Sequence, residues 1–353
     1  MEQMVKGTYV YKVDPEKPDP NKIAACAWLL KTGKTVAFPT ETVYGLGADA
    51  LCPEAVAGIF AAKGRPSDNP LIVHVAKRED CELLAEPVSA RARRLMEIFW
   101  PGPLTLVLPR RKGVSPLVTA GLDTVALRMP DHKVALALIQ EAKMPIAAPS
   151  ANVSGRPSPT CAAHVLKDMA GRIGAVLDGG ETGIGLESTV LDVTRKVPVI
   201  LRPGGITRLD IEAVVGEVKV EKTQEDEAIF LPRSPGMKYR HYAPEADMLV
   251  VEGNPNRTAE EIIKEAKAAS AAGKKVVVLA PKEHLFRYEG FWAVSMGQEK
   301  KPETIARRLY KLLREMDDLR VDLILAQGID SSGIGAAIMN RLRKASGFSI
   351  RRV

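Results

Sequence analysis

The sequence predicts an α/β protein with two domains, and three observations support this prediction. The chain has 353 residues, which is long for a single hydrophobic core. Short apolar runs alternate with helical patterns along most of it, as in sheets that are covered by helices. Residues 216–245 follow neither period and are rich in proline and glycine, which is typical of an interdomain linker. We therefore expect a first domain over residues 1–215 and a second over 246–353.

The helices of the first domain are predicted from an apolar face and from the residues that stop a helix. Ile23, Ala27 and Leu30 share one face of the earliest helix. Gly64 should end the second helix, and the turn Pro101-Gly102-Pro103 should end the third. The expected helices are 21–31, 53–62, 89–99, 133–142 and 160–170.

The strands of the first domain are short apolar runs bounded by turn residues. One of them leads directly into residues 39–47, a loop rich in Thr, Gly and Pro. Loops at the carboxyl ends of strands are where α/β sheets usually bind ligands. The expected strands are 8–13, 35–38, 71–75, 104–108, 124–130, 146–148, 175–178 and 199–202.

The second domain should be a small parallel sheet, because its strands and helices alternate. Its loops hold few residues of catalytic types apart from 328–335, so we expect a regulatory or structural role. The expected strands are 248–251, 275–280, 291–294 and 321–326, and the expected helices are 258–272, 302–316 and 334–344.

Composition narrows the class of protein. The net charge of +7 and the pI near 9.1 favour anionic partners such as nucleotides or RNA, although the basic residues are dispersed. The four cysteines form no CxxC pair, so they indicate neither a zinc site nor a disulfide framework. We find no apolar run of membrane-spanning length and no signal peptide, and therefore expect a cytoplasmic protein.

The segment from Lys63 to His74 is the strongest candidate for a binding site. Lys63 offers a point charge and Arg65 a planar fork, so the two can hold one polyanion from two sides. The strand that follows delivers His74. Taken singly, Lys63 could complement its helix dipole, Arg65 could be solvated and His74 could be an ordinary strand residue. Their clustering favours a site.

Other strands also end in polar residues. Arg128 lies in an otherwise apolar strand, where a charge must be paired or must face a ligand. Thr40 and Thr42 supply hydroxyl groups and Glu41 could orient a cation, although each could also simply form the turn. Arg202 ends a later strand in the same way.

Two further loops suit an anion. Residues 149–155 combine Ser150, Asn152 and Ser154 with backbone N–H groups, although helix capping near Ser158 or Thr160 is the alternative. Residues 179–185 contain four glycines, which suits a loop that closes over a site.

The predicted linker differs from ordinary Ser/Gly-rich linkers. It carries Lys238, Tyr239, Arg240, His241 and Tyr242 in succession. Basic and aromatic side chains of this kind suit an anionic ligand, so we expect the linker to reach back over the site of the first domain and close it.

Five motifs in this order resemble the YrdC family. They are Phe-Pro-Thr-Glu-Thr-Val-Tyr-Gly-Leu at 38–46, Lys-Gly-Arg-Pro with Asn-Pro-Leu at 63–71, Ala-Pro-Ser-Ala-Asn-Val-Ser-Gly at 148–155, Ser-Thr-Val at 188–190 and Leu-Arg-Pro-Gly at 201–204. Ser-Pro-Gly-Met at 234–237, His-Tyr-Ala-Pro at 241–244 and the appended α/β unit are similar to the long, two-domain threonylcarbamoyl-AMP synthases. The resemblance covers nearly the whole chain.

The resemblance implies a nucleotidyltransferase that joins L-threonine, bicarbonate or carbon dioxide, and ATP into threonylcarbamoyl-AMP, with release of pyrophosphate. Partner proteins would transfer the threonylcarbamoyl group to tRNA. The implied fold is a twisted mixed sheet with a concave, positive face, followed by a smaller Rossmann-like domain. Magnesium would be held mainly by the phosphates, because no carboxylate cluster marks a protein-built metal site.

The resemblance also implies the roles of individual residues. Lys63 and Arg65 would be catalytic, stabilising charge on the phosphates. The implied nucleotide contacts are Lys63, Arg65, Asn69, Thr124, Ser150, Ser158, Arg202 and Tyr242. The implied L-threonine contacts are Thr42, His74, Arg128, the backbone of Ala148, and Ser188.

The alternative hypothesis is a non-catalytic RNA-binding or ribosome-maturation module. The positive charge supports it, and it predicts an affinity for double-stranded RNA that falls steeply with salt. Aromatic residues make up only 5% of the chain, which speaks against platforms that stack single-stranded bases.

Overall fold

The computed structural model describes residues 3–221 and 241–353, which divide into two compact units. The first unit holds residues 3–154, 158–183 and 187–221, and the second holds 155–157, 184–186 and 241–353. Residues 222–240 of the predicted linker lie outside the described residues, so its boundaries and its closing role stay predictions.

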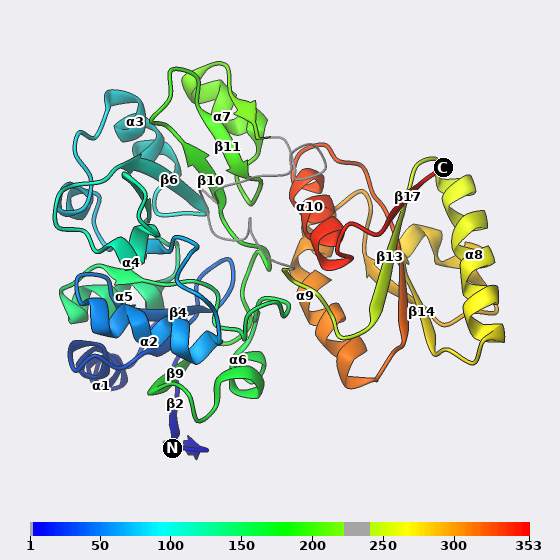
Figure 1. The fold of residues 1–353 in the computed structure, drawn as a ribbon, viewed down its shortest axis with the longest axis horizontal. Coiled ribbons are helices and arrows are strands. Elements are labelled where there is room, and N and C mark those ends of the chain that lie inside the picture. The colour runs from blue at the N-terminus through cyan, green and yellow to red at the C-terminus, as the bar shows by residue number, and fades with distance from the viewer. Residues whose placement is uncertain (1–2, 222–240) are drawn as a thin grey trace. The chain divides into compact units, whose positions relative to one another are not determined.

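The first unit is built on a mixed sheet, as expected (Figure 1). Parallel and antiparallel neighbours alternate irregularly across it. In order across the sheet the strands are β1 (Gln3–Val5), β2 (Thr8–Lys12), β9 (Ala175–Asp178), β3 (Val36–Phe38), β4 (Gly45–Asp49), β8 (Ile146–Ala147), β5 (Ile72–His74), β7 (Thr124–Arg128), β6 (Leu104–Pro109), β10 (Thr189–Asp192), β11 (Val199–Arg202) and β12 (Lys219–Val220).

Helices pack against both faces of this sheet. Because side chains alternate along a strand, Val36 and Phe38 of β3 join a core with α1 and α5, whereas Ala37 joins a second core with α2 and α3. The helices are α1 (Pro20–Lys31), α2 (Pro53–Lys63), α3 (Ala90–Phe99), α4 (Pro116–Thr119), α5 (Lys133–Ala142), α6 (Ala162–Met169) and α7 (Arg208–Val215), with a 3₁₀ helix at Glu79–Leu83.

The expected elements are found with small shifts at their ends, whereas β1, β4, β10, β12, α4 and α7 were not predicted. We expected residues 39–47 to form a loop, but Gly45–Asp49 is a strand between β3 and β8. A Cβ atom at Gly47 would lie 2.7 Å from Phe38 Cε1 and 2.8 Å from Ile146 Cγ2. Glycine in this strand therefore reflects close packing rather than a turn.

The second unit contains a wholly parallel sheet, as expected. Helix α8 (Pro255–Ala271) covers one face of the sheet, and α9 (Pro302–Asp318) and α10 (Gly335–Ala345) cover the other (Figure 1). A 3₁₀ helix spans Lys282–Tyr288. In order across the sheet the strands are β15 (Ala293–Gly297), β14 (Val276–Pro281), β16 (Leu323–Gln327), β13 (Asp247–Glu252) and β17 (Ile350–Arg352).

Candidate functional site

Arg128 is the centre of a buried polar cluster in the first unit. It is the last residue of β7, and only 3% of its surface is exposed. Its Nη1 donates to Thr42 Oγ1 at 2.9 Å and its Nε to the Gly102 carbonyl oxygen at 3.2 Å. Its Nη2 lies 2.5 Å from Glu41 Oε1 in an ion pair. These three contacts hold the guanidinium plane in one orientation.

Thr42 is oriented by its neighbour Thr40. The Thr40 hydroxyl donates to the Val43 carbonyl oxygen at 2.7 Å, and the Thr40 and Thr42 hydroxyl oxygens lie 2.8 Å apart. Because the Thr40 proton is used, Thr42 is the donor in that pair. The Thr42 oxygen also accepts a hydrogen bond from Arg128, so this hydroxyl has one lone pair left for a ligand.

His74 is buried at the end of β5. Burial, and then the nearby charge of Arg128, lower the pKa of His74 to about 3, so its imidazole is neutral at physiological pH. The ring packs edge-on against Phe38 with centroids 6.2 Å apart. Among the residues that the structure describes, no hydrogen-bond partner reaches its Nδ1. This nitrogen can therefore serve a bound molecule.

Ser188 and Arg202 form a second cluster that borders the first. Arg202 Nη2 donates to the Ser188 carbonyl oxygen at 3.0 Å and to Ser188 Oγ at 3.2 Å. Thr105 Oγ1 of β6 lies 2.7 Å from Ser188 Oγ. The turn at Gly102 and Pro103 links the two clusters, because Gly102 accepts from Arg128 and Pro103 accepts from the Thr189 N–H at 2.9 Å.

Lys63 ends α2, and its ammonium group points into the loop after β8. Its Nζ donates to the Ser150 carbonyl oxygen at 2.6 Å and to that of Asn152 at 2.7 Å. Burial and the neighbouring Arg65 hold the pKa of Lys63 well below its usual range. Gly64, with φ of 62°, turns the chain immediately after it.

Arg65 and Asn69 lie together in the turn that follows. Arg65 Nη2 donates to the Asn69 carbonyl oxygen at 2.8 Å, and its guanidinium carbon lies 5.7 Å from the centre of the Phe60 ring. The side-chain amide of Asn69 is fully buried, and neither polar atom has a hydrogen-bond partner within residues 3–221 and 241–353. A buried amide without partners points to a bound molecule.

The remaining predicted residues are more dispersed. Ala148 donates its N–H to the Ile72 carbonyl oxygen at 2.9 Å, and Ser158 Oγ donates to Glu187 Oε1 at 2.6 Å. Thr124 is half-buried at the opposite end of β7 from Arg128. Tyr242 belongs to the second unit, where it stacks on Tyr310 with centroids 5.3 Å apart, so its predicted place over the nucleotide stays a prediction.

Sequence reasoning missed three groups that support the site. Thr105 bonds Ser188, Glu187 bonds Ser158, and the Gly102 carbonyl bonds Arg128. Thr105 carried a signal, because it is the single polar residue in the apolar run 104–108. The Gly102 carbonyl carried none, because a backbone group has no sequence signature.

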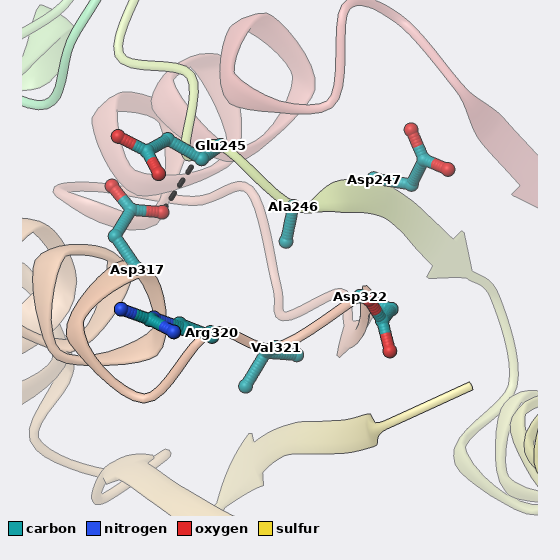
Figure 2. A pocket seen from close by; sticks show the side chains of 7 residues that line it. All are labelled: Glu245, Ala246, Asp247, Asp317, Arg320, Val321 and Asp322. Atoms are coloured by element: carbon teal, nitrogen blue, oxygen red, sulfur yellow. Dashed lines mark hydrogen bonds between the residues drawn. The ribbon is translucent and has the colours of Figure 1, made fainter. Parts of the chain in front are cut away.

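A pocket of about 280 Å³ lies in the second unit, at the start of β13 and β16 (Figure 2). Its carboxylates already accept backbone hydrogen bonds: Asp317 from Glu245 N and Asp322 from Lys275 N, each at 2.7 Å. These two bonds account for Asp317 and Asp322, and Glu245 and Asp247 are the other acidic residues of the lining. In the described part of the chain, no group of three or more His, Cys, Asp or Glu is placed to hold a metal ion.

Comparison with known proteins extends these observations. The family model described as telomere recombination, which covers Sua5, YciO and YrdC, matches residues 28–204. The model of the threonylcarbamoyl-AMP synthase C-terminal domain matches residues 206–347.

Two relatives match nearly the whole chain. The threonylcarbamoyl-AMP synthase of Pyrococcus abyssi is 50% identical to this chain, and the match covers 94% of this chain and 96% of the relative. The threonylcarbamoyl-AMP synthase of Bacillus subtilis is also 50% identical, and the match covers 98% of this chain and 99% of the relative. The crystal structure of P. abyssi Sua5 complexed with L-threonine is 49% identical, with a TM-score of 0.92 over 98% of this chain and 99% of that one.

Proposed function

Because this chain belongs to the threonylcarbamoyl-AMP synthase family, we propose that it joins L-threonine, bicarbonate or carbon dioxide, and ATP into threonylcarbamoyl-AMP and releases pyrophosphate. The observation that carries the proposal is the buried cluster of Arg128, Thr42 and His74. A fixed guanidinium with a hydroxyl and a neutral imidazole beside it suits a small zwitterion such as an amino acid.

In this proposal Arg128 grips the carboxylate of L-threonine. Thr42 and Ser188 supply hydroxyl groups for its polar atoms, and His74 supplies a neutral nitrogen. The N–H of Ala148 is already bonded to Ile72, so its carbonyl oxygen is the backbone group that would accept from the substrate. The complex of P. abyssi Sua5 with L-threonine supports amino-acid binding by this fold.

ATP would be bound by Lys63, Arg65, Asn69, Thr124, Ser150, Ser158, Arg202 and Tyr242. Burial disfavours the charged form of Lys63, and a phosphate group beside it would favour that form again. The surroundings of Lys63 are therefore suited to binding a polyanion. The unpartnered amide of Asn69 is a further group that a nucleotide could bond.

The reaction would proceed in two steps. The amine of L-threonine first takes up the carbon of bicarbonate or carbon dioxide, and proximity supplies much of the acceleration. A carbamate oxygen then attacks the α-phosphorus as pyrophosphate departs in line. Lys63, Arg65 and Arg202 would stabilise the charge that builds on the phosphate oxygens.

Magnesium would be held mainly by the triphosphate. Since the described residues lack a cluster of three or more metal-ligating side chains, we assign no step to a metal bound by the protein. None of the helices in the described ranges combines the length and the apolar character that a membrane span needs. A cytoplasmic location is part of the proposal.

The product would be passed to threonylcarbamoyl-transferase proteins that act on tRNA, so this chain would perform the first step of that modification. Direct binding of double-stranded RNA is a separate proposal, tested by the salt dependence of its affinity.

The test of the proposed function is pyrophosphate release from ATP by the purified protein. L-threonine and bicarbonate are omitted in turn. We expect release to require both. Release that is independent of either would contradict the proposal.

A further inference from the structure

Glu41 lies in the loop between β3 and β4 with only 13% of its side chain exposed. Among the described residues, its close polar contact is the ion pair with Arg128. In the part of the chain that the structure describes, no hydrogen-bond donor other than that guanidinium reaches either of its carboxylate oxygens. A buried carboxylate usually accepts several hydrogen bonds, so this one keeps vacant acceptor positions.

The surroundings of Glu41 are well defined. Glu41 and the next residue in the chain, Thr42, both bond to Arg128, and they do so through different nitrogens of the guanidinium group. His132, at the start of α5, also feels the charge of Glu41; burial lowers the pKa of His132 and Glu41 opposes that shift. The loop after β9 approaches from a third side, since a Cβ atom at Gly183 would lie 3.8 Å from the Glu41 carbonyl oxygen.

The proposed reaction needs a group that can accept a proton. L-threonine enters as an ammonium ion, and its nitrogen can attack carbon only after it has lost a proton. His74 does not serve, because an imidazole with a pKa of about 3 is too weak a base to keep an accepted proton at neutral pH. Lys63 belongs to the proposed phosphate site, where it donates to the carbonyl oxygens of Ser150 and Asn152. Glu41 is the acidic side chain in direct contact with Arg128.

We propose that Glu41 binds the ammonium group of L-threonine and accepts its proton. This inference rests on the proposed function, which places the substrate carboxylate at Arg128. That carboxylate would compete with Glu41 for Nη2. Glu41 would then lose its cationic partner and gain an anionic neighbour, and both changes favour proton uptake by a carboxylate.

The step balances with bicarbonate as the carbon source. One proton moves from the ammonium nitrogen to a Glu41 oxygen. The nitrogen lone pair forms a bond to the bicarbonate carbon, and the carbon–oxygen bond to the hydroxyl group breaks. Of the two protons still on the nitrogen, one joins this hydroxide to form water and the other stays, which leaves a carbamate anion. Glu41 returns its proton to solvent before the next turnover.

The experiment compares wild type, Glu41→Gln and Glu41→Asp, with Glu97→Gln as a matched control on the exposed face of α3. Pyrophosphate release is measured at saturating L-threonine, bicarbonate and ATP from pH 7 to pH 9.5. Glutamine keeps the size of the side chain but cannot take up the proton. Circular dichroism melting confirms that each variant is folded.

We expect Glu41→Gln to lower kcat about 100-fold at pH 7.5, within the usual range for a lost general base. Its rate should recover by about tenfold per pH unit as free amine accumulates in solution. The kcat of Glu41→Asp should lie between those of Glu41→Gln and wild type. If Glu41 only holds Arg128 in place, the loss of kcat in Glu41→Gln should not recover as the pH rises. This result would overturn the inference.

A Glu41→Gln variant whose kcat stays within threefold of wild type would also overturn it, while the proposed function would stand on the wild-type activity. If wild type itself releases no pyrophosphate in response to L-threonine, both the proposed function and the role of Glu41 fall. The two failures are therefore distinguishable.

Discussion

Arg128 and His74 lie directly opposite each other in the parallel pairing of β5 and β7. A permanent positive charge thus faces an imidazole within the buried interior. Burial and this charge both disfavour the protonated ring and lower the pKa of His74 to about 3. The pair therefore presents one cation and one neutral nitrogen, not two cations.

The first prediction concerns acid stability. Unfolded His74 binds a proton near its ordinary pKa of about 6.5, whereas the folded protein resists protonation until about pH 3. Between these pH values the unfolded state binds more protons than the folded state. The contribution of His74 to the free energy of unfolding is therefore fully present above pH 6.5 and is lost as the pH falls towards 3. Urea unfolding at pH 7, 5.5 and 4.5 should show wild type losing up to about 1.4 kcal/mol per pH unit more than His74→Asn. Parallel pH dependences in the two proteins would contradict this assignment.

The second prediction concerns Lys63 and ATP. The pKa of Lys63 is low in the free protein, and phosphate should raise it, so ATP binding should be coupled to proton uptake. Calorimetry at pH 8.5 in two buffers with different ionisation enthalpies measures that uptake. Lys63→Met should abolish it, whereas the exposed-site control Lys77→Met should not. An uptake that persists in Lys63→Met would assign the proton to another group.

The third prediction concerns the two cations of the central turn. Lys63→Ala and Arg65→Ala should each abolish pyrophosphate release while the protein stays folded. Lys63→Ala also leaves the carbonyls of Ser150 and Asn152 without their donor, at a cost of about 1–3 kcal/mol. Melting curves monitor this loss separately from activity. Full activity in both variants would remove this turn from the mechanism.

The fourth prediction separates the two substrates. Arg128→Lys keeps the charge but loses the planar fork that bonds Thr42 and Glu41. We expect kcat/KM for L-threonine to fall about 100-fold, which corresponds to about 2.7 kcal/mol. The Kd for ATP alone should change less than threefold. An equal loss for ATP would indicate a general disruption of the sheet.

The fifth prediction tests the linker. A truncation after residue 216 would remove the buried Val218 and β12, which pairs with β11. A protein that ends at residue 221 keeps both and is the better variant. We expect it to release pyrophosphate more slowly, or to lose threonylcarbamoyl-AMP to solvent faster, than the full chain. Unchanged activity and retention would refute a closing role for residues 234–244.

Sequence patterns were most informative where local rules agree. Helix α5 lies over the predicted residues 133–142, because its apolar face, the cap by His132 and the left-handed Lys143 all favour the same bounds. Helix α7 was not predicted, although Thr207 and Asp210 form a capping box that marks its start. Strand β4 was not predicted because Gly45 and Gly47 resemble turn residues, and their close packing against Phe38, Ile146 and Ala148 is visible only in the structure.

The candidate site was predictable as residue types but not as contacts. Arg128 was identified because a charge in an apolar strand needs a partner. That its partners would be Glu41 and Thr42 depends on the order of strands across the sheet, which no local pattern encodes. The contacts of Thr105 and Glu187 depend on the same order.

The strand order also determines when this protein can acquire its structure during synthesis. Strand β2 pairs with β9 rather than with β3, so residues 8–12 have no partner in that direction until residue 178 has left the ribosome. In the second unit, β13 pairs on one side with β17, the strand of that sheet that is latest in the sequence. That sheet is completed only after β17 has been synthesised. Until then, an apolar strand such as β13 has an unpaired edge, and unpaired edges of this kind are prone to aggregation.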